Sequence, residues 1–193
     1  AKKINKFGAI GPIYFDKSRK YKKNVLIEKK KIIAAAMLIQ TKIFIQIKGY
    51  DENFFLYYED DDFFKKCNSL KLKLYLVTNA LFGHTKYQKT LKTLNLHSTT
   101  FSNKEEKNST YIIGGWHGQW SKFYYLKKHN GFFSALLKCL PNIILNLIQI
   151  LPYTLLNPTK AKYKFFKIEG FLCSLIGMSS FKRSKYDKKY IYK

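Results

Sequence analysis

Arginine and acidic residues are both scarce in this 193-residue chain. Only Arg19 and Arg183 are arginines, so nearly all of the 36 basic residues are lysines, and they face only 12 acidic residues. Arginine usually makes the bidentate contacts to phosphates and base edges, so its scarcity argues against a nucleic-acid reader. The net charge of +24 still predicts attraction to an anionic partner, such as an acidic membrane surface or a phosphorylated small molecule, unless the lysines merely coat the surface.

Cysteine is scarce as well, and its placement excludes two classes of small protein. Cys67, Cys139 and Cys173 lie far apart, with no CxxC pair and no Cys/His spacing of the kind that zinc requires. The chain is therefore neither a disulfide scaffold nor a zinc module, and a reducing cytoplasm fits it. Residues 1–7 are basic and polar with no apolar stretch behind them, which predicts no signal peptide.

What remains predicts an α/β protein of one domain, or of one domain with an appendage. Hydrophobic residues make up 46% of the chain and aromatic residues 17%, which is enough for a core. Apolar runs predict strands at 7–15, ending in a Gly-Pro turn, at 32–39, buried on both faces, at 73–77 and at 80–84. We expect helices at 41–49, from Glu59 onward and at 120–132, and loops at 16–31 and 85–112.

The stretch from Ala135 to Leu156 differs from the rest because it is almost entirely apolar and contains no acid. Its four polar residues are Lys138, Asn142, Asn146 and Gln149. Their spacing of four, four and three predicts one narrow polar stripe on a helix, which Pro141 and Pro152 bend or bound. Such a helix suits the membrane interface, with neighbouring lysines meeting anionic lipid. The alternative is a helix packed on the rest of the chain or on a second subunit.

Four of the twelve acids stand side by side at Glu59–Asp62, directly after the aromatic run Phe54–Tyr58. A helix start explains one or two of them, because the macrodipole stabilises acids in the first turn by roughly 0.3–1 kcal/mol each. Four adjacent acids repel one another, and the aromatic run would desolvate them and make them more basic. A general base or a metal ligand is the functional alternative for this corner.

At this point the sequence resembles a known family. The segment AAAMLIQTKIFIQIKGYDENFFLYYEDDDFFKKC, followed by LKLYLVTNALFGH, is similar to the C-terminal half of the catalytic domain of family 2 glycosyltransferases, in particular the rhamnosyltransferase-like branch. The matching positions are Ala34–Ile39, Gly49–Phe55, Tyr58–Asp60, Asp62 and His84. FGAIGPIYF and WSKFYYLKKHNG also look like segments of this family, so the resemblance covers roughly residues 7–131.

The resemblance implies an α/β fold of the GT-A type, which binds a nucleotide-sugar and transfers the sugar with inversion. By the motif, Asp60 corresponds to the general base, and His84 to a position that coordinates the metal or contacts the diphosphate. The acceptor side would include Asp51, Tyr58, Glu59 and Asp62. The family also implies a divalent cation, Mg²⁺ or Mn²⁺, whose main ligands we expect in a segment upstream of these residues. We accordingly expect residues 1–193 alone to lack most of the donor site and not to turn over.

Two domains are therefore expected, the C-terminal part of a GT-A catalytic domain at 1–131 and a helical, membrane-associating extension at 132–193. The predicted function is transfer from a nucleotide-sugar such as dTDP-rhamnose to a saccharide or lipid-linked acceptor, in polysaccharide assembly at the cytoplasmic face of the membrane. The alternative is a non-catalytic basic module that binds a membrane or nucleic acid, as a remnant of such an enzyme. Four carboxylates beside the aromatics disfavour nucleic acid, because they would repel its phosphates.

Overall fold

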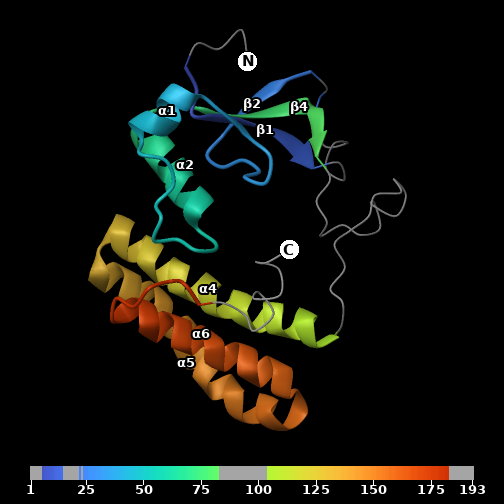
Figure 1. Ribbon diagram of the computed structural model, residues 1–193, viewed down its shortest axis with the longest axis vertical. Helices are drawn as coiled ribbons and strands as arrows, with labels where there is room; N and C mark the ends of the chain where they lie inside the picture. Colours follow the sequence, from blue (N-terminus) through green and yellow to red (C-terminus); the bar gives the residue numbers. More distant parts are fainter. Residues whose placement is uncertain (1–5, 15–21, 23, 83–103, 183–193) are drawn as a thin grey trace, which may run out of the picture. The chain divides into compact units, whose positions relative to one another are not determined.

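A computed structural model of the chain describes residues 6–14, 22, 24–82 and 104–182, and it has mixed α/β content (Figure 1). The contacts divide the chain into two compact units. Unit 1 comprises Ala1–Asp51 and Asp60–Thr100, and unit 2 comprises Glu52–Glu59 and Phe101–Lys193. The boundary between the units falls inside the acidic cluster, between Glu59 and Asp60.

Unit 1 is built on a four-stranded mixed sheet with the order β2-β4-β1-β3. Strands β1 (Ala9–Tyr14) and β4 (Leu74–Phe82) form the parallel central pair, and their register shifts between Pro12 and Ile13. The edge strands β2 (Leu26–Lys29) and β3 (Leu38–Ile39) run antiparallel to β4 and β1 respectively. A parallel pair needs a crossover connection, and here the chain between β1 and β4 supplies two helices.

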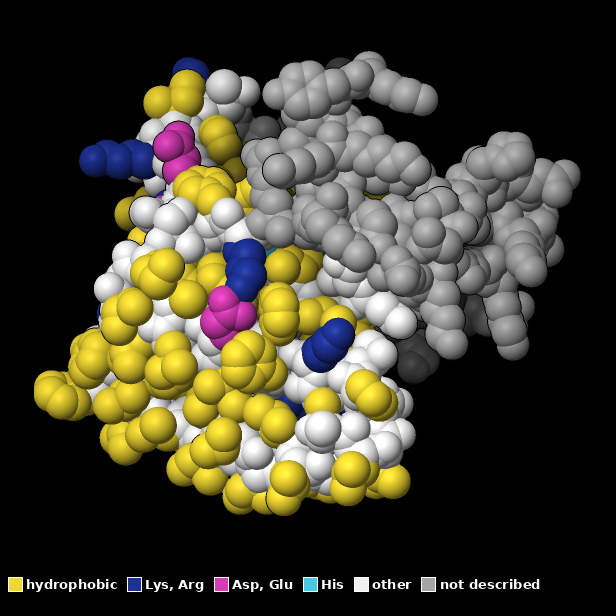
Figure 2. Space-filling view, turned by 60° about the horizontal axis from the view of Figure 1, so that its bottom comes forward, with side chains coloured by type: hydrophobic (Ala, Val, Ile, Leu, Met, Phe, Trp, Pro, Cys, Tyr) yellow, Lys and Arg dark blue, Asp and Glu magenta, His cyan; other side chains and the backbone are white. Residues whose placement is uncertain are grey.

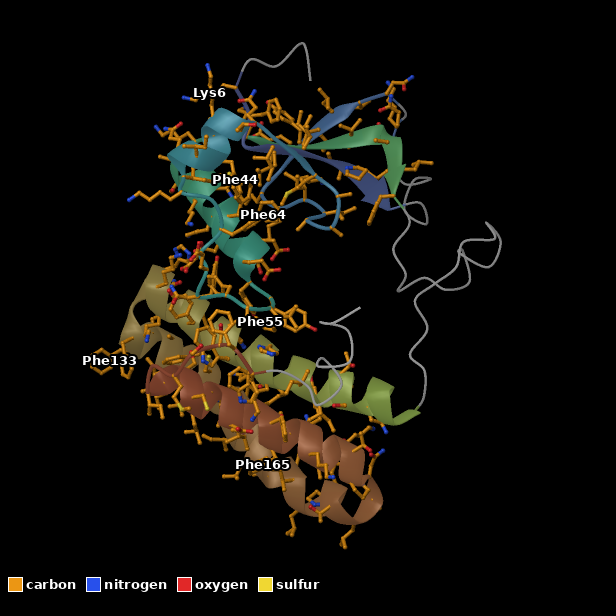
Figure 3. The ribbon with its side chains drawn as sticks, viewed as in Figure 1. Lys6, Phe44, Phe55, Phe64, Phe133 and Phe165 are labelled. Carbon is orange, nitrogen blue, oxygen red and sulfur yellow. The ribbon has the colours of Figure 1, made fainter. Side chains whose placement is uncertain are left out.

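Helices α1 (Thr41–Gln46) and α2 (Glu59–Ser69) close the core of unit 1. The helical spacing of Phe63 and Cys67 places both side chains on the buried face of α2, as predicted, whereas Leu70 is exposed. Figure 3 shows Phe44 and Phe64 in this region, and both belong to the packed cluster. The buried members of that cluster are Ala9, Ile43, Ile47, Phe63, Phe64, Cys67, Leu72 and Leu74.

The described part of unit 2 contains three helices, α4 (Lys104–Asn130), α5 (Phe132–Leu156) and α6 (Pro158–Leu175), which pack along one another (Figure 1). Gly131, with φ +83°, makes the turn between α4 and α5 in the left-handed region that favours glycine. Asn157 caps α6 by accepting a hydrogen bond from the Lys160 amide at 3.1 Å, and Pro158 follows at the first helical position. The predicted domain boundary at 131/132 separates α4 from helices with which it packs, and that boundary stays a prediction.

Several element predictions need correction. Strand β2 lies inside the predicted loop 16–31, the two strands predicted at 73–77 and 80–84 are one strand, and α4 begins at Lys104 inside the predicted loop 85–112. The Gly-Pro pair stands within β1 rather than ending it, and only Leu38–Ile39 of the predicted strand 32–39 pairs in the sheet. Strand β2 was not predicted because it is a mostly exposed edge strand that contains Glu28 and Lys29. Its sequence therefore lacks the alternation of apolar and polar residues that marks a half-buried strand.

Gly170 makes the close approach of α6 to α4 possible. A Cβ atom there would lie 3.0 Å from the carbonyl carbon and 3.1 Å from the Cα of Trp116, backbone atoms that cannot rotate away. We expect Gly170→Ala to lower the free energy of unfolding of unit 2 by about 1–3 kcal/mol, the usual cost of overpacking. Trp116 and Trp120 both lie in α4, so tryptophan fluorescence during urea unfolding reports on this unit.

Gly118→Ala is the matched control for this prediction. Its Cβ would lie 3.7 Å from a ring carbon of Tyr57, an ordinary van der Waals distance. Alanine is the better helix former by roughly 0.8–1 kcal/mol, so this variant is expected to be as stable as the wild type or more stable. Equal destabilisation by both substitutions would contradict the account of the helix crossing.

Candidate functional site

The acidic cluster forms the first turn of α2, as the sequence predicts, and a distorted backbone leads into it. Tyr57 and Tyr58 both have φ +69°, in the left-handed region that tyrosine rarely occupies. Each such residue costs on the order of 1–3 kcal/mol and persists only where the surrounding structure imposes it. Two such residues stand directly before Glu59. The backbone conformation of this junction is therefore imposed by the surrounding structure, because the local sequence disfavours it.

Asp60 is a half-buried member of the cluster, and its surroundings alter its pKa. Its carboxylate accepts a hydrogen bond from the Asp61 amide at 2.8 Å. Burial raises the pKa of Asp60 above the ordinary value of 3.8, and the charge of Asp61 adds to the increase. The Asp61 amide and the charge of Lys31 oppose the shift without cancelling it. A carboxylate of raised pKa is a stronger proton acceptor than an ordinary surface aspartate.

The two following aspartates have different surroundings. Asp61 forms an ion pair with the exposed lysine Lys31, at the surface of unit 1. Asp62 is fully buried, and its carboxylate lies 3.1 Å from the ammonium of Lys66, one helical turn later. Lys66 also donates a hydrogen bond to the carbonyl oxygen of Gly49 at 3.1 Å. Asp62 is therefore tied to Lys66, which also holds the turn after α1, and its side chain does not reach solvent.

The other predicted site residues occupy both units. Asp51 is half-buried in unit 1, while Tyr58 and Glu59 are half-buried in unit 2. The ring of Tyr58 lies against that of Tyr125 on α4, with 5.3 Å between the ring centroids. His84 falls outside the described residues, so its metal-binding role stays a prediction. Within the described ranges, no three His, Cys, Asp or Glu side chains come together as a metal site would require.

The segment Glu52–Glu59 is held against the helices of unit 2 by contacts that sequence reasoning missed. The Ser121 hydroxyl on α4 donates to the carbonyl oxygen of Leu56 at 2.8 Å. The Ser180 hydroxyl, after α6, donates to the carbonyl oxygen of Asn53 at 2.6 Å. Phe54 is buried with its ring edge-on to Tyr124, at 5.0 Å between centroids. These contacts fix the aromatic segment that precedes the acids, which is consistent with the imposed geometry at Tyr57 and Tyr58.

Ser121 and Ser180 carry no sequence signal of their own, because a lone serine in a helix or after one fits any surface. Their importance follows only from the carbonyl groups they meet 65 and 127 residues away along the chain. No family model, curated protein or solved structure matches this chain.

Proposed function

We propose that this chain is the acceptor side of an inverting, rhamnosyltransferase-like glycosyltransferase of the GT-A type, with Asp60 as the general base. The proposal depends mainly on the carboxylate of Asp60, which is half-buried and has a raised pKa. Asp60 lies in the first turn of α2, shortly after two tyrosines with positive φ. The motif resemblance around Gly49–Phe55 and Tyr58–Asp62 supports it independently of the geometry. Helix-dipole stabilisation alone would favour exposed acids of low pKa.

In the proposed reaction, an acceptor hydroxyl attacks the anomeric carbon of the sugar from the face opposite the nucleoside diphosphate. The new bond joins the acceptor oxygen to the anomeric carbon as the bond from that carbon to the diphosphate oxygen breaks. Asp60 receives the proton of the hydroxyl, and the nucleoside diphosphate leaves with the bonding electron pair. The carboxylate is needed because an alcohol is a weak nucleophile while it keeps its proton.

The diphosphate leaving group requires positive charge, which the family supplies with Mg²⁺ or Mn²⁺. The described residues offer single carboxylates such as Asp60 and Asp61 but no cluster of three ligands, so they do not form a site for the ion by themselves. His84 stays a candidate ligand by the motif resemblance. No step of the reaction above depends on the ion being held by a described residue.

We also propose a nucleotide-sugar such as dTDP-rhamnose as donor, a saccharide or lipid-linked acceptor, and a peripheral position at the cytoplasmic face of the membrane. The excess of lysine and the apolar helix α5 support the membrane position. Among the described residues, α5 is the one helix long and apolar enough to cross a membrane.

The proposal is tested by incubating the protein, expressed in its complete reading frame, with radiolabelled nucleotide-sugars and membrane lipid extract. We expect one donor to label the acceptor fraction. Because the base must be ionised, kcat/KM should rise with pH through the pKa of Asp60, so its acid limb should lie above pH 3.8. Absence of transfer from every donor, with the protein folded, would overturn the proposal.

A further inference from the structure

The outward face of α5 is a continuous apolar surface. Seven of its exposed apolar side chains recur every three or four residues, so these seven lie on one side of the helix. Figure 2 shows hydrophobic side chains gathered over the helical part of the molecule, and Phe133 can be located in Figure 3. This apolar face consists of Phe133, Leu137, Pro141, Ile144, Ile148, Leu151 and Leu155.

The polar residues of α5 point largely the other way. Asn146 is only 1% exposed, and its side-chain amide donates to the Asn142 side-chain oxygen at 3.0 Å. Gln149 is partly buried, and only Lys138 of the expected polar stripe is well exposed. The helix therefore turns polar groups toward its neighbours and apolar groups outward, the reverse of a water-facing helix. The expected interfacial helix would have turned this stripe toward water.

The low burial of α5 differs from that of an apolar helix in the core of a soluble protein. Only 17% of the most apolar 18-residue window of α5 is buried, whereas a core helix is mostly buried. A row of exposed side chains such as Leu151, at 77%, and Leu155, at 86%, is far more than scattered surface hydrophobics. An exposed apolar face of this kind indicates contact with another apolar surface, such as lipid or a protein partner.

Charged residues on the neighbouring helices distinguish between two positions of α5 in a membrane, across the bilayer or along its surface. At 1.5 Å per residue, α5 is about 37 Å long, enough to cross a hydrocarbon core of about 30 Å. However, α4 and α6 pack along its inner side. They carry Lys122, Lys127, Lys164, Lys167 and Glu169. A crossing α5 would draw these groups toward hydrocarbon, where each charge costs roughly 2.5–3.5 kcal/mol at the centre.

Lysines also flank both ends of α5. Lys127 and Lys128 precede it in the last turn of α4. At the other end, the ammonium of Lys160 lies 5.4 Å from the ring centroid of Tyr153. Lysine and tyrosine side chains of this kind keep an apolar stem in lipid and a polar tip among headgroups. With no acidic residue in α5 to oppose it, an anionic membrane is the occupant that this combination of charge and apolar surface favours.

We propose that α5 lies in the plane of an anionic membrane with its apolar face immersed, and does not cross it. Helices α4 and α6 form the polar side of this monotopic bundle, and the lysines at both ends of α5 contact headgroup phosphates. The inference deepens the proposed membrane position and rests on it, but it does not depend on sugar transfer. Vesicle binding and transfer can therefore fail separately.

The first test is flotation of the full chain with vesicles of phosphatidylcholine and phosphatidylglycerol at 7:3. The double variant Ile148→Glu/Leu151→Glu should lose at least tenfold in partitioning, because it places two charges on the immersed face. Ile45→Glu is the control, since Ile45 is 69% exposed in α1 of unit 1, and it should float like the wild type. Thermal unfolding of each variant checks that it is folded.

Wild-type partitioning by the folded double variant would overturn the proposal. The proposal would also be overturned if the wild-type chain did not bind vesicles but formed a dimer, and if the double variant did not dimerise. A second copy of the chain would then cover the apolar face.

The orientation of α5 in the membrane is tested by measuring how deeply tryptophan probes along the helix lie in the bilayer. Phe133→Trp, Ile144→Trp and Leu155→Trp place a probe at the two ends and the middle of one side of α5, and lipids brominated at two acyl positions quench it. The signal of the wild-type tryptophans, Trp116 and Trp120, is subtracted. Equal depth at all three positions is expected. A probe at 144 near the bilayer centre, with 133 and 155 near opposite surfaces, would show a crossing helix and overturn the proposal.

Discussion

Asp60→Asn is expected to lower the rate of sugar transfer by a factor of roughly 10²–10⁴, the usual contribution of a general base. Asparagine keeps the shape and the hydrogen-bonding oxygen of aspartate but cannot accept the proton of the acceptor hydroxyl. The loss should appear in kcat more than in KM, since proton transfer belongs to the transition state. Initial rates with the labelled donor, in the complete reading frame, measure it.

The control is Asp61→Asn, which removes the same charge from the same helical turn. Asp61 pairs with the exposed Lys31, so its loss should change transfer only a few-fold. Unfolding should not explain the loss in Asp60→Asn. Because burial raises the pKa of Asp60 in the folded state, its ionised form opposes folding once the pH exceeds 3.8. The asparagine variant removes that opposition at neutral pH. Transfer near the wild-type rate would show that Asp60 is not the base.

Lys66→Met is expected to destabilise unit 1 by roughly 3–5 kcal/mol, the cost of removing one partner of a buried ion pair. The carboxylate of Asp62 is fully buried 3.1 Å from the Lys66 ammonium, and methionine cannot compensate its charge. The carbonyl group of Gly49 loses its hydrogen bond from the same ammonium. Hydrogen exchange of the α2 and β4 amides measures the effect, because both tryptophans lie in unit 2.

Lys65→Met is the matched control, since Lys65 is an exposed neighbour on the same helix. A surface change of this kind usually stays within about 0.5 kcal/mol. The double variant Asp62→Leu/Lys66→Met should recover much of the lost stability, because no charge is then left buried. If Lys66→Met and Lys65→Met behave alike, the ion pair does not stabilise the unit.

The features that were predictable from the sequence are those with strong local signals. The start of α2 follows from the acids at Glu59–Asp62, because a helix N-terminus stabilises one or two of them, and its buried face follows from Phe63 and Cys67. The apolar run that became α5 is equally plain. In contrast, β2 depends on pairing with β4 more than on its own composition. Ala34–Ala36 form a turn and a bend, although the apolar run around them predicts a strand.

The candidate site was only partly predictable for a related reason. The sequence does not distinguish the four adjacent acids Glu59–Asp62 from one another. On a helix, successive side chains point about 100° apart and therefore have different surroundings. Asp62 and Lys66 are four residues apart, a spacing that predicts an ion pair on a helix, although it does not predict that Asp62 is buried. The polar stripe of α5 was found, yet its direction was not, because periodicity defines a face without saying what covers it.

The anomeric configuration of the product tests the central claim most directly. The complete protein is supplied with the nucleotide-sugar donor that labels the acceptor fraction, and the new linkage is analysed by proton NMR. Direct attack by a hydroxyl deprotonated by Asp60 predicts a configuration opposite to that of the donor. Retained configuration, or no product with any donor, would contradict the account.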